Sequence, residues 1–513
     1  MKYIVGADRN QISIMPDTLE DYVDENNICR VIDAFVESLN LVVLGFKHAK
    51  LSSTGRPPYH PAILLKLFIY GMLNRVRSSR RLQAEAIRNV EVMWLLNKLV
   101  PDDKTICNFR KDNKKAIVKV FKEFNKFCLT QDLFSRETVA VDGSKFRANN
   151  SRKNIYTREI VDKNLAEIER KLSIKVTEYL GELEKNDASE AAEDMLNINN
   201  IAHDRINQAI KVLNEPKPDV SPTAGKTPKQ EMEEAIKELN IKKHELKNII
   251  AEMDKAGENQ HATNDSDSRL MIPGGDGRNF DARYNVQSVA DVKHSLILDF
   301  DVTNGCNDKG QLKNMTDRAK DVMEVDSINA LADTGYYDGD DIAACEENGI
   351  TCFVTKPLSP GQAPKQLRAD KFKYDKDLDV YLCPMKKIFE RSHYQTIDGK
   401  QLPVYTCNSC FQCPVKNLCT KNPTGKQIIR NFNQDILDTV NKRTEENTEL
   451  YKKRGQVVEH PFGTIKSVWG FRNFLCRGFE MVNAEMALTC LAYNFRRVFN
   501  IFNNNNKKLN FNT

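Results

Sequence analysis

The strand-like segments of this chain fall into two groups that a long helical stretch separates. The β-branched run at 137–142 reads as a strand, yet the next strand-like run begins only at residue 284. Between them, the apolar residues of 157–257 recur every three or four positions in a charged background, and a Pro-rich break at 215–228 divides this stretch. A sheet that contains the first run must therefore be completed by residues far along the chain. The sequence predicts a discontinuous α/β domain that is interrupted by two antiparallel helices.

The second group of strand-like runs alternates with helical patterns. Two strands joined by a turn at 291–294 come first, and helix, strand, helix and strand follow. This order predicts a mixed sheet flanked by helices. A further helix is expected at 447–470, after a second insertion, and a C-terminal helix at 482–503. The runs of the second group are 284–290, 295–302, 309–323, 327–332, 339–348 and 350–355.

Residues 20–132 read as a series of helices. Ser78 or Ser79 can cap one of them, and Asp102 or Asp103 can cap the next. Two short helices followed by a basic one are typical of a helix-turn-helix, whose last helix enters a DNA groove. A small helical bundle with another function has the same pattern, so the pattern alone leaves both readings open.

Composition by itself identifies no binding partner. The 513 residues carry 76 Lys and Arg against 71 Asp and Glu, and the net charge of +5 is too small to indicate nucleic-acid binding. The length indicates several domains. The basic residues are clustered, however, and Arg80, Arg81 and Arg110 belong to clusters that suit phosphate binding. A solvated helix face is the alternative reading of such a cluster.

Two aspartates end strand-like runs. Asp142 closes the first run, and Asp333 closes the run at 327–332. A carboxylate at the end of a strand stands on rigid backbone and points into open space, as a divalent-metal site for phosphoryl transfer requires. Either residue alone also fits a turn, because a glycine follows each of them within two residues.

The chain is expected in the cytoplasm, with no membrane partner. No apolar run reaches the ~18 residues of a membrane span, and the N-terminus lacks the pattern of a secretory signal. In the cytosol the 13 cysteines should be reduced, so a local concentration of thiols indicates a metal site.

Five cysteines are concentrated in the second insertion. Cys407, Cys410 and Cys413 form two overlapping Cys-x-x-Cys pairs, a spacing that lets two thiolates bind one tetrahedral Zn²⁺. Cys383 could close the site from a β-hairpin, and Cys419 follows. Five candidates exceed the usual four ligands, so one of them should be a bystander.

Longer stretches of the sequence resemble the bacterial insertion-sequence transposases of the DDE type, and the group numbered eleven-eighty-two in particular. The resemblance covers most of the chain. It is carried by the two aspartates and by the segments Tyr-His-Pro-Ala-Ile-Leu-Leu-Lys-Leu, Ser-Ser-Arg-Arg-Leu-Gln, Ala-Arg-Tyr-Asn-Val-Gln and Glu-His-Pro-Phe-Gly at 59–67, 78–83, 282–287 and 459–463.

The resemblance implies a catalytic triad of Asp142, Asp333 and Glu459 that holds two Mg²⁺ or Mn²⁺ ions per active site. Related transposases show Tyr, two residues, Arg, three residues, Glu, six residues, Lys. Tyr451, Arg454, Glu459 and Lys466 match this signature, except that four residues separate Arg454 from Glu459. We expect Tyr451, Arg454 and Lys466 to position DNA phosphates.

Two details of this helix remain open in the sequence. A one-residue π bulge at Gly455, or a helix that begins later, could accommodate the extra residue, whereas Pro461 disfavours helical geometry before it. Similar transposases also show Cys-x-x-Cys-Pro followed by a later Cys. The resemblance therefore favours zinc ligation by Cys383, Cys410, Cys413 and Cys419, with Cys407 as the alternative ligand.

The sequence is thus expected to encode a DNA transposase with a ribonuclease-H-like α/β core, an N-terminal all-α domain, a helical insertion and a small cysteine-rich insertion. Its partners would be double-stranded DNA, as terminal inverted repeats and target, and a second copy of the chain on that DNA, in the bacterial nucleoid. A transposase-derived DNA-binding regulator, or a ribonuclease-H-like nuclease without strand transfer, is the alternative. The expected boundaries are 1–132 (DNA binding), 133–156 with 259–356 (core), 157–258 (helical insertion), 357–446 (zinc-binding insertion) and 447–513 (catalytic and C-terminal helices).

Overall fold

The computed structural model describes residues 18–51, 57–187, 228–272, 280–357, 364–397, 399–505, 509 and 511. Within these ranges the chain divides into two compact units. The first unit comprises residues 18–149 and 283–511, and the second comprises residues 150–272 and 280–282.

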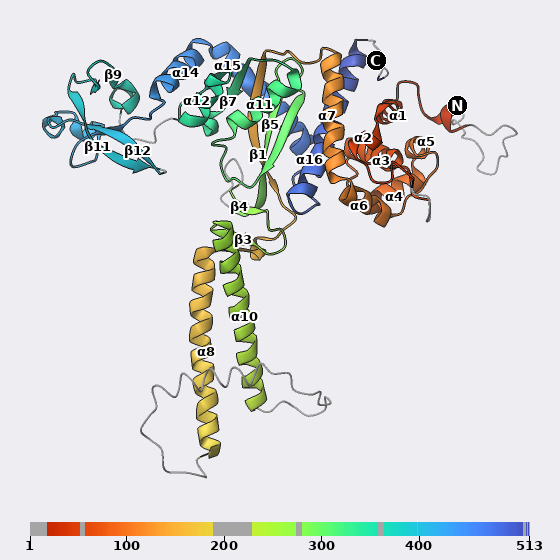
Figure 1. Ribbon diagram of the computed structural model, residues 1–513, viewed down its shortest axis with the longest axis horizontal. Coiled ribbons are helices and arrows are strands. Elements are labelled where there is room, and N and C mark those ends of the chain that lie inside the picture. Colours follow the sequence, from red (N-terminus) through yellow and green to blue (C-terminus); the bar gives the residue numbers. More distant parts are fainter. Residues whose placement is uncertain are drawn as a thin grey trace, which may run out of the picture. The chain divides into compact units, whose positions relative to one another are not determined.

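Five strands of a six-stranded mixed sheet lie mainly in the first unit, and they pair in the order β6-β5-β1-β7-β8 (Figure 1). The central strand β1 pairs antiparallel with β5 and parallel with β7. Next to them, β6 pairs antiparallel with β5 and β8 pairs parallel with β7. The predicted strands on both sides of the helical stretch therefore join one sheet. They are β1 (Thr138–Arg147), β5 (Asp281–Asp291), β6 (Ile297–Thr303), β7 (Ile328–Ala332) and β8 (Ile350–Val354).

Helices cover both faces of this sheet. Successive residues of a strand point to opposite faces, and Ala140 of β1 packs with Val457 and Val458 of α15. Val139 and Val141 point to the other face and are fully buried. The expected mixed sheet flanked by helices is confirmed. The flanking helices are α11 (Leu312–Met323), α12 (Gly339–Glu347), α14 (Gln434–Glu446), α15 (Thr448–Gly463) and α16 (Phe479–Asn504).

Helices also occupy the part of the first unit before β1. Ser78 caps α4 and Asp102 caps α6, because each side chain accepts a hydrogen bond from the backbone N–H three residues later. Phe124 of α7 stacks on Phe495 of α16 with ring centroids 5.1 Å apart. The helices are α1 (Ile28–Ser38), α2 (Leu41–Leu44), α3 (Pro61–Leu73), α4 (Ser79–Arg88), α5 (Val90–Leu95), α6 (Asp103–Asp112) and α7 (Lys114–Thr130).

The second unit is built on two long helices that pack against each other, α8 (Arg158–Asp187) and α10 (Pro228–Ala256) (Figure 1). Val161, Leu246 and Met253 form their buried apolar cluster. At the base of the pair, β2 (Ile155–Thr157) is antiparallel to β3 (Gln260–Ala262), and β4 (Arg269–Met271) follows. Almost all of the Pro-rich break lies outside the described residues.

The cysteine-rich part of the chain contains a small antiparallel sheet of its own, with the order β13-β12-β11-β10-β9. Tyr381, Phe389 and Tyr405 fill its core together with the buried thiols of Cys407 and Cys410. In the described part of the chain, no helix is both long and apolar enough to cross a membrane. The strands are β9 (Lys373–Asp375), β10 (Val380–Leu382), β11 (Ile388–Ile397), β12 (Lys400–Thr406) and β13 (Gln427–Ile429), and α13 (Lys416–Cys419) is a short helix.

Candidate active site

Asp142 and Asp333 occupy matching positions on neighbouring parallel strands. Ala140 of β1 pairs with Leu331 of β7, and each aspartate stands two residues beyond its member of this pair. Asp142 lies inside β1, which continues to Arg147, so it does not end its strand as the sequence suggested, whereas Asp333 directly follows β7. The pairing of β1 with β7 ends at Ala140 and Leu331, and both aspartates stand just beyond that point. Asp333 follows β7 and caps a 3₁₀ turn, η3 (Thr334–Tyr336), where its Oδ1 accepts the N–H of Gly335 at 2.7 Å. The structure brings together the two aspartates that the sequence singled out.

The surroundings of Asp142 disfavour its negative charge. Burial raises the pKa of Asp142 to about 7, with further contributions from the charges of Asp333 and Asp308, while Arg454 opposes the shift. A carboxyl group that titrates near neutrality beside two other acids gains from a nearby positive charge. The edge of the sheet is therefore an electrostatic site for a cation.

Glu459 stands on the helix that packs against this sheet, one residue after the buried Val458. Its own side chain is exposed, and its Oε1 lies near Gly455, 3.7 Å from where a Cβ of that glycine would stand. Among the described residues it makes no hydrogen bond or ion pair. On α15, Arg454 is the residue whose charge acts strongly on Asp142. Arg454 thus lies close enough to the aspartate pair for its charge to act on Asp142.

The other two residues of the basic signature contact the sheet. The hydroxyl of Tyr451 bonds to the carbonyl oxygen of Ala332, and Lys466 Nζ donates to the carbonyl oxygen of Lys145 at 2.8 Å. Lys466 Nζ also lies 4.3 Å from the centre of the Phe146 ring. Burial lowers the pKa of Lys466 to about 8, and the positive charges of Arg283 and Arg472 add to the shift.

The helix that carries these residues has its π-helical turn at a different position from the one considered in the sequence. Gly455 lies within regular α15, so a π bulge there is not observed. A π-helical turn instead occupies η7 (Thr464–Val468), where Trp469 N–H donates to Thr464 O at 2.9 Å, five residues back. Pro461 is accommodated inside α15 and does not end it. The extra residue between Arg454 and Glu459 is therefore not absorbed before Glu459.

Asp308 follows the strand-like run at 295–302, where Asp301 and Asp308 read as structural residues of which either could also assist a metal. In the structure Asp308 lies beside the two aspartates. Its Oδ1 accepts hydrogen bonds from the side-chain amides of Asn285 and Gln287, at 2.8 and 2.7 Å. Both amides are buried in β5. Two polar amides at alternate positions of a buried strand were the signal in the sequence, since buried amides require partners.

The acids provide the oxygen donors that Mg²⁺ and Mn²⁺ prefer, and Asp142, Asp333 and Asp308 act on one another through their charges. The arrangement of these side chains, however, is not that of a metal site. In the ranges that the structure describes, no three His, Cys, Asp or Glu side chains converge closely enough to hold a metal ion. The chemistry of the site fits a divalent cation, whereas its geometry is not that of a closed metal site.

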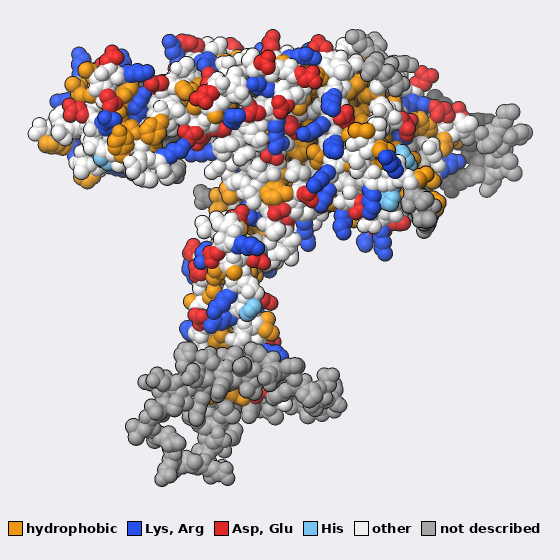
Figure 2. All heavy atoms as spheres, viewed as in Figure 1, with side chains coloured by type: hydrophobic (Ala, Val, Ile, Leu, Met, Phe, Trp, Pro, Cys, Tyr) orange, Lys and Arg blue, Asp and Glu red, His pale blue; other side chains and the backbone are white. Residues whose placement is uncertain are grey.

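The N-terminal arginines differ in accessibility. The side chains of Arg80 and Arg81 are both exposed, and Arg80 is 89% exposed although it pairs with Asp103 at 3.4 Å, so both can reach a ligand outside the protein. Arg110 is half-buried, with its guanidinium 5.8 Å from the centre of the Phe68 ring. Figure 2 shows Lys and Arg side chains at the edge of the surface near α6, with acidic side chains among them.

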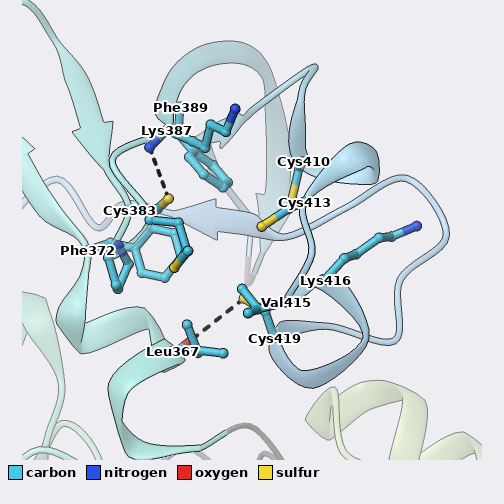
Figure 3. Close-up of a pocket in the computed structure, with 12 residues that line it drawn as sticks. Leu367, Phe372, Cys383, Lys387, Phe389, Cys410, Cys413, Val415, Lys416 and Cys419 are labelled. Atoms are coloured by element: carbon cyan, nitrogen blue, oxygen red, sulfur yellow. Dashed lines mark hydrogen bonds between the residues drawn. The ribbon is translucent and has the colours of Figure 1, made fainter.

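The four cysteines favoured by the resemblance surround one pocket. Cys383, Cys410, Cys413 and Cys419 all line it, and Figure 3 shows their side chains arranged around its centre. The thiol of Cys383 accepts the N–H of Lys387 at 3.2 Å, in the turn between β10 and β11. Burial raises the pKa of Cys419, and the other three thiols contribute to that shift. The four thiols thus line one pocket, although in the described part of the chain they do not converge closely enough to form a metal site.

Cys407 is placed differently. It does not line the pocket, and its Sγ contacts Ser409 Oγ at 3.3 Å. The thiol of Cys410, by contrast, accepts the N–H of Lys426 at 3.4 Å. The preceding Gly425 has φ +102°, and a Cβ there would stand 2.9 Å from the Cβ of Cys410. The backbone therefore fits closely around Cys410, as in loops that wrap thiolate ligands.

Two known protein families match parts of the chain. Residues 382–499 match the family described as Transposase DDE domain, and residues 17–112 match the Transposase domain family DUF772. The first match contains the cysteine pocket and the basic signature with Glu459, and the second contains Arg80, Arg81 and Arg110. No curated protein and no solved structure matches the chain.

Proposed function

Because this chain belongs to the insertion-sequence transposases of the DDE type, we propose that it binds both ends of its element as double-stranded DNA and catalyses metal-dependent cleavage and strand transfer there. The proposed catalytic residues are Asp142, Asp333 and Glu459. Within the family, the motifs of the sequence favour the group numbered eleven-eighty-two. The two Mg²⁺ or Mn²⁺ ions would activate the attacking oxygen and stabilise the leaving oxygen of the phosphodiester.

One observation carries this proposal, which is the register that puts Asp142 and Asp333 at equivalent positions of adjacent parallel strands. Two carboxylates fixed by a sheet at a single edge provide a rigid anionic site beside which a phosphodiester can be held. Arg454 stands next to them on α15 and would offset the negative charge of the DNA backbone. Lys466, on the following π turn, would do the same from the side of β1.

The exposed arginines Arg80 and Arg81 support end binding by the N-terminal helices, at residues 1–132. Phosphate contacts of this kind position a protein on DNA. The helical pair at 157–258 would support pairing of two protomers or of two DNA ends, since its helices carry the exposed apolar residues Ile160, Ile174 and Ile241 and no catalytic acid. The active assembly is then a homodimer on DNA.

The cysteine pocket is proposed to hold one structural Zn²⁺ on Cys383, Cys410, Cys413 and Cys419. Four thiols line one small pocket, and backbone N–H groups bond to two of the sulfurs, so the residues supply the four sulfur donors that a structural Zn²⁺ takes. Cys407 is assigned as the bystander because its side chain lies outside the pocket. The ion would stabilise the small sheet and leave the chemistry to the acids.

The experiment that tests the function separates binding from cleavage. The substrate is a duplex that carries the end sequence of the element, taken from the DNA flanking its gene. Asp333→Asn and Asp142→Asn keep shape and hydrogen bonding but remove a negative charge, as does Glu459→Gln. We expect wild-type protein to nick this duplex with Mg²⁺ or Mn²⁺, and each variant to bind it normally but to lose cleavage by 100-fold or more.

Two other outcomes would replace the proposal. Wild-type protein that binds the end sequence but does not cut it with either ion would be a DNA-binding regulator. Protein that cuts the duplex but never joins the freed 3′ end to a second DNA would be a nuclease. Cleavage that survives all three substitutions would place the active site elsewhere.

A further inference from the structure

Asp308 lies in the loop between β6 and α11, outside every motif that marked the acidic site. One of its oxygens, Oδ1, accepts both the Nδ2 of Asn285 and the Nε2 of Gln287. These two amides stand two residues apart on the same face of β5 and are fully buried. Two buried neutral donors therefore bind Oδ1 of the half-exposed Asp308 carboxylate. Its other oxygen, Oδ2, accepts neither of these hydrogen bonds.

A second contact ties Asp308 to the turn that carries Asp333. Tyr336, three residues after Asp333, is fully buried, and its hydroxyl donates to Oε1 of Gln287. A carboxylate only accepts hydrogen bonds, so the nitrogen of the Gln287 carboxamide faces Asp308 and its oxygen faces the Tyr336 hydroxyl. The orientation of Asp308 is thus set by residues that also set the turn after β7.

Two glycines bring the backbone close to Asp308. Gly143 follows Asp142 and pairs with Gln287 across β1 and β5. A Cβ at Gly143 would overlap Asp308 Oδ1 and would stand 2.6 Å from Gln287 Nε2. A Cβ at Gly335 would stand 3.4 Å from Asp308 Oδ2. Asp308 therefore lies between the backbone that follows Asp142 and the backbone that follows Asp333.

An unsatisfied acceptor stands in the same place. The carboxamide oxygen of Asn285 is buried and has no hydrogen-bond partner in the described part of the chain, although its nitrogen is bonded to Asp308. A buried acceptor without a donor costs about 1–3 kcal/mol and is found where an ion or a water molecule completes the site. It indicates that a cation, with its hydration shell, belongs beside Asp308.

We infer that Asp308 is the third carboxylate of the divalent-metal site in the DNA-free protein, alongside Asp142 and Asp333, in the role that the sequence assigned to Glu459. Asn285 and Gln287 act as its positioning residues. This inference rests on the proposed function, because it assumes that the acidic edge of the sheet binds the catalytic ion. Like charges repel, so three carboxylates that stand near one another without converging are expected when no cation is bound.

The test measures Mn²⁺ affinity of the full chain without DNA, by electron paramagnetic resonance of the free ion. Asp308→Asn keeps an acceptor oxygen for both amides, and we expect it to weaken Mn²⁺ binding by at least tenfold. Glu459→Gln should change the affinity by less than threefold. Asp301→Asn is the control, because Asp301 lies within the preceding strand β6 and pairs with Arg318 at 3.3 Å, and it should leave the affinity within twofold.

The outcomes separate this inference from the function beneath it. Unchanged affinity in Asp308→Asn, together with lost affinity in Asp142→Asn, would overturn the role of Asp308 and leave the active site in place. Unchanged affinity in Asp142→Asn would overturn both. If Asp308→Asn does not fold, the Mn²⁺ affinity of Gln287→Met tests the inference instead. This variant keeps the Asp308 carboxylate and removes the amide that donates to it. An affinity of this variant equal to that of Asp301→Asn would contradict the inference.

Discussion

The hydroxyl of Tyr451 on α15 lies 3.2 Å from the carbonyl oxygen of Ala332, the residue before Asp333, and 2.9 Å from Thr355 Oγ1. The tyrosine of the basic signature is therefore bonded to the protein itself, at the end of β7. Since α15 also carries Arg454 and Glu459, this contact fixes the helix relative to the turn of Asp333. Tyr451 is thus suited to align the two halves of the active site.

Tyr451→Phe should separate alignment from DNA binding. Loss of the hydroxyl should lower the free energy of unfolding by about 1 kcal/mol and slow cleavage, because α15 loses its bond to β7. The salt dependence of DNA binding should not change. Arg454→Gln should instead reduce the slope of log K against log [salt] by about one, as expected for one lost phosphate contact. Filter binding over a salt series measures both slopes, and equal losses in the two variants would make Tyr451 a DNA contact.

Lys466 should make stability depend on alkaline pH. Its pKa is lowered to about 8 in the folded chain, whereas an ordinary lysine titrates near 10.5. Between these pH values the unfolded chain binds more protons than the folded one, so stability rises with pH. We expect wild type to gain stability relative to Lys466→Met between about pH 8 and pH 10.5. Urea unfolding at a series of pH values measures this gain.

Lys452 provides the control for this effect, because its side chain is 65% exposed and pairs with Glu449 on the surface of α15. Lys452→Met should show no change relative to wild type across the same pH window. If the Lys466→Met and wild-type curves ran parallel from pH 8 to pH 10.5, the ammonium group would not be buried as the structure has it.

The cysteine pocket predicts a metal content. Purified protein should contain about one zinc per chain by mass spectrometry, and Cys410→Ser with Cys413→Ser should lose the zinc and lower the melting temperature. Cys407→Ser is the matched variant, since this thiol lies outside the pocket, and it should keep the zinc. Zinc-free wild-type protein, or loss of zinc in Cys407→Ser alone, would contradict the assignment.

Gly143 should tolerate no side chain. Gly143→Ala would push Asp308 away from Gln287, so we expect a loss of stability of about 1–3 kcal/mol and weaker Mn²⁺ binding. Gly181 of α8 has open space around it, and Gly181→Ala should stabilise that helix by up to about 1 kcal/mol. Chemical denaturation of both variants checks the contrast. A Gly143→Ala protein as stable as wild type would show that Asp308 moves freely.

Much of this architecture could be predicted from local patterns. The runs that end at Asp142 and Asp333 were recognisable because β-branched residues cluster in strands, and Ser78 and Asp102 were recognisable as caps by their side-chain oxygens. The strands and caps depend on residues close together in the sequence. The adjacency of the strands that carry the two aspartates does not, and it was expected only from the resemblance to a known fold.

The sequence left open whether Asp301 or Asp308 could assist a metal, and it could not choose between them, because the placement of Asp308 depends on tertiary contacts with Asn285 and Gln287. The sequence also did not predict where the helix that begins with α15 departs from regular α-helical geometry. The expected bulge at Gly455 depended on spacing alone, whereas the structure has the π turn after Pro461, which cannot donate a backbone hydrogen bond to the helix. The spacing of motif residues within a helix does not show where the helix changes from α-helical to π-helical geometry.

The β1–β5 pairing also governs how the chain can fold during synthesis. Asp142 pairs with Ser288, which is 288 − 142 = 146 positions later. At the usual rates of translation, β1 leaves the ribosome roughly 7 to 30 s before its antiparallel partner. During that interval the two long helices can form from local contacts, and the β2–β3 ribbon can close their base. The helical pair would then act as a folding clamp that shortens the loop between β1 and β5 and limits the time for which an unpaired strand edge can aggregate.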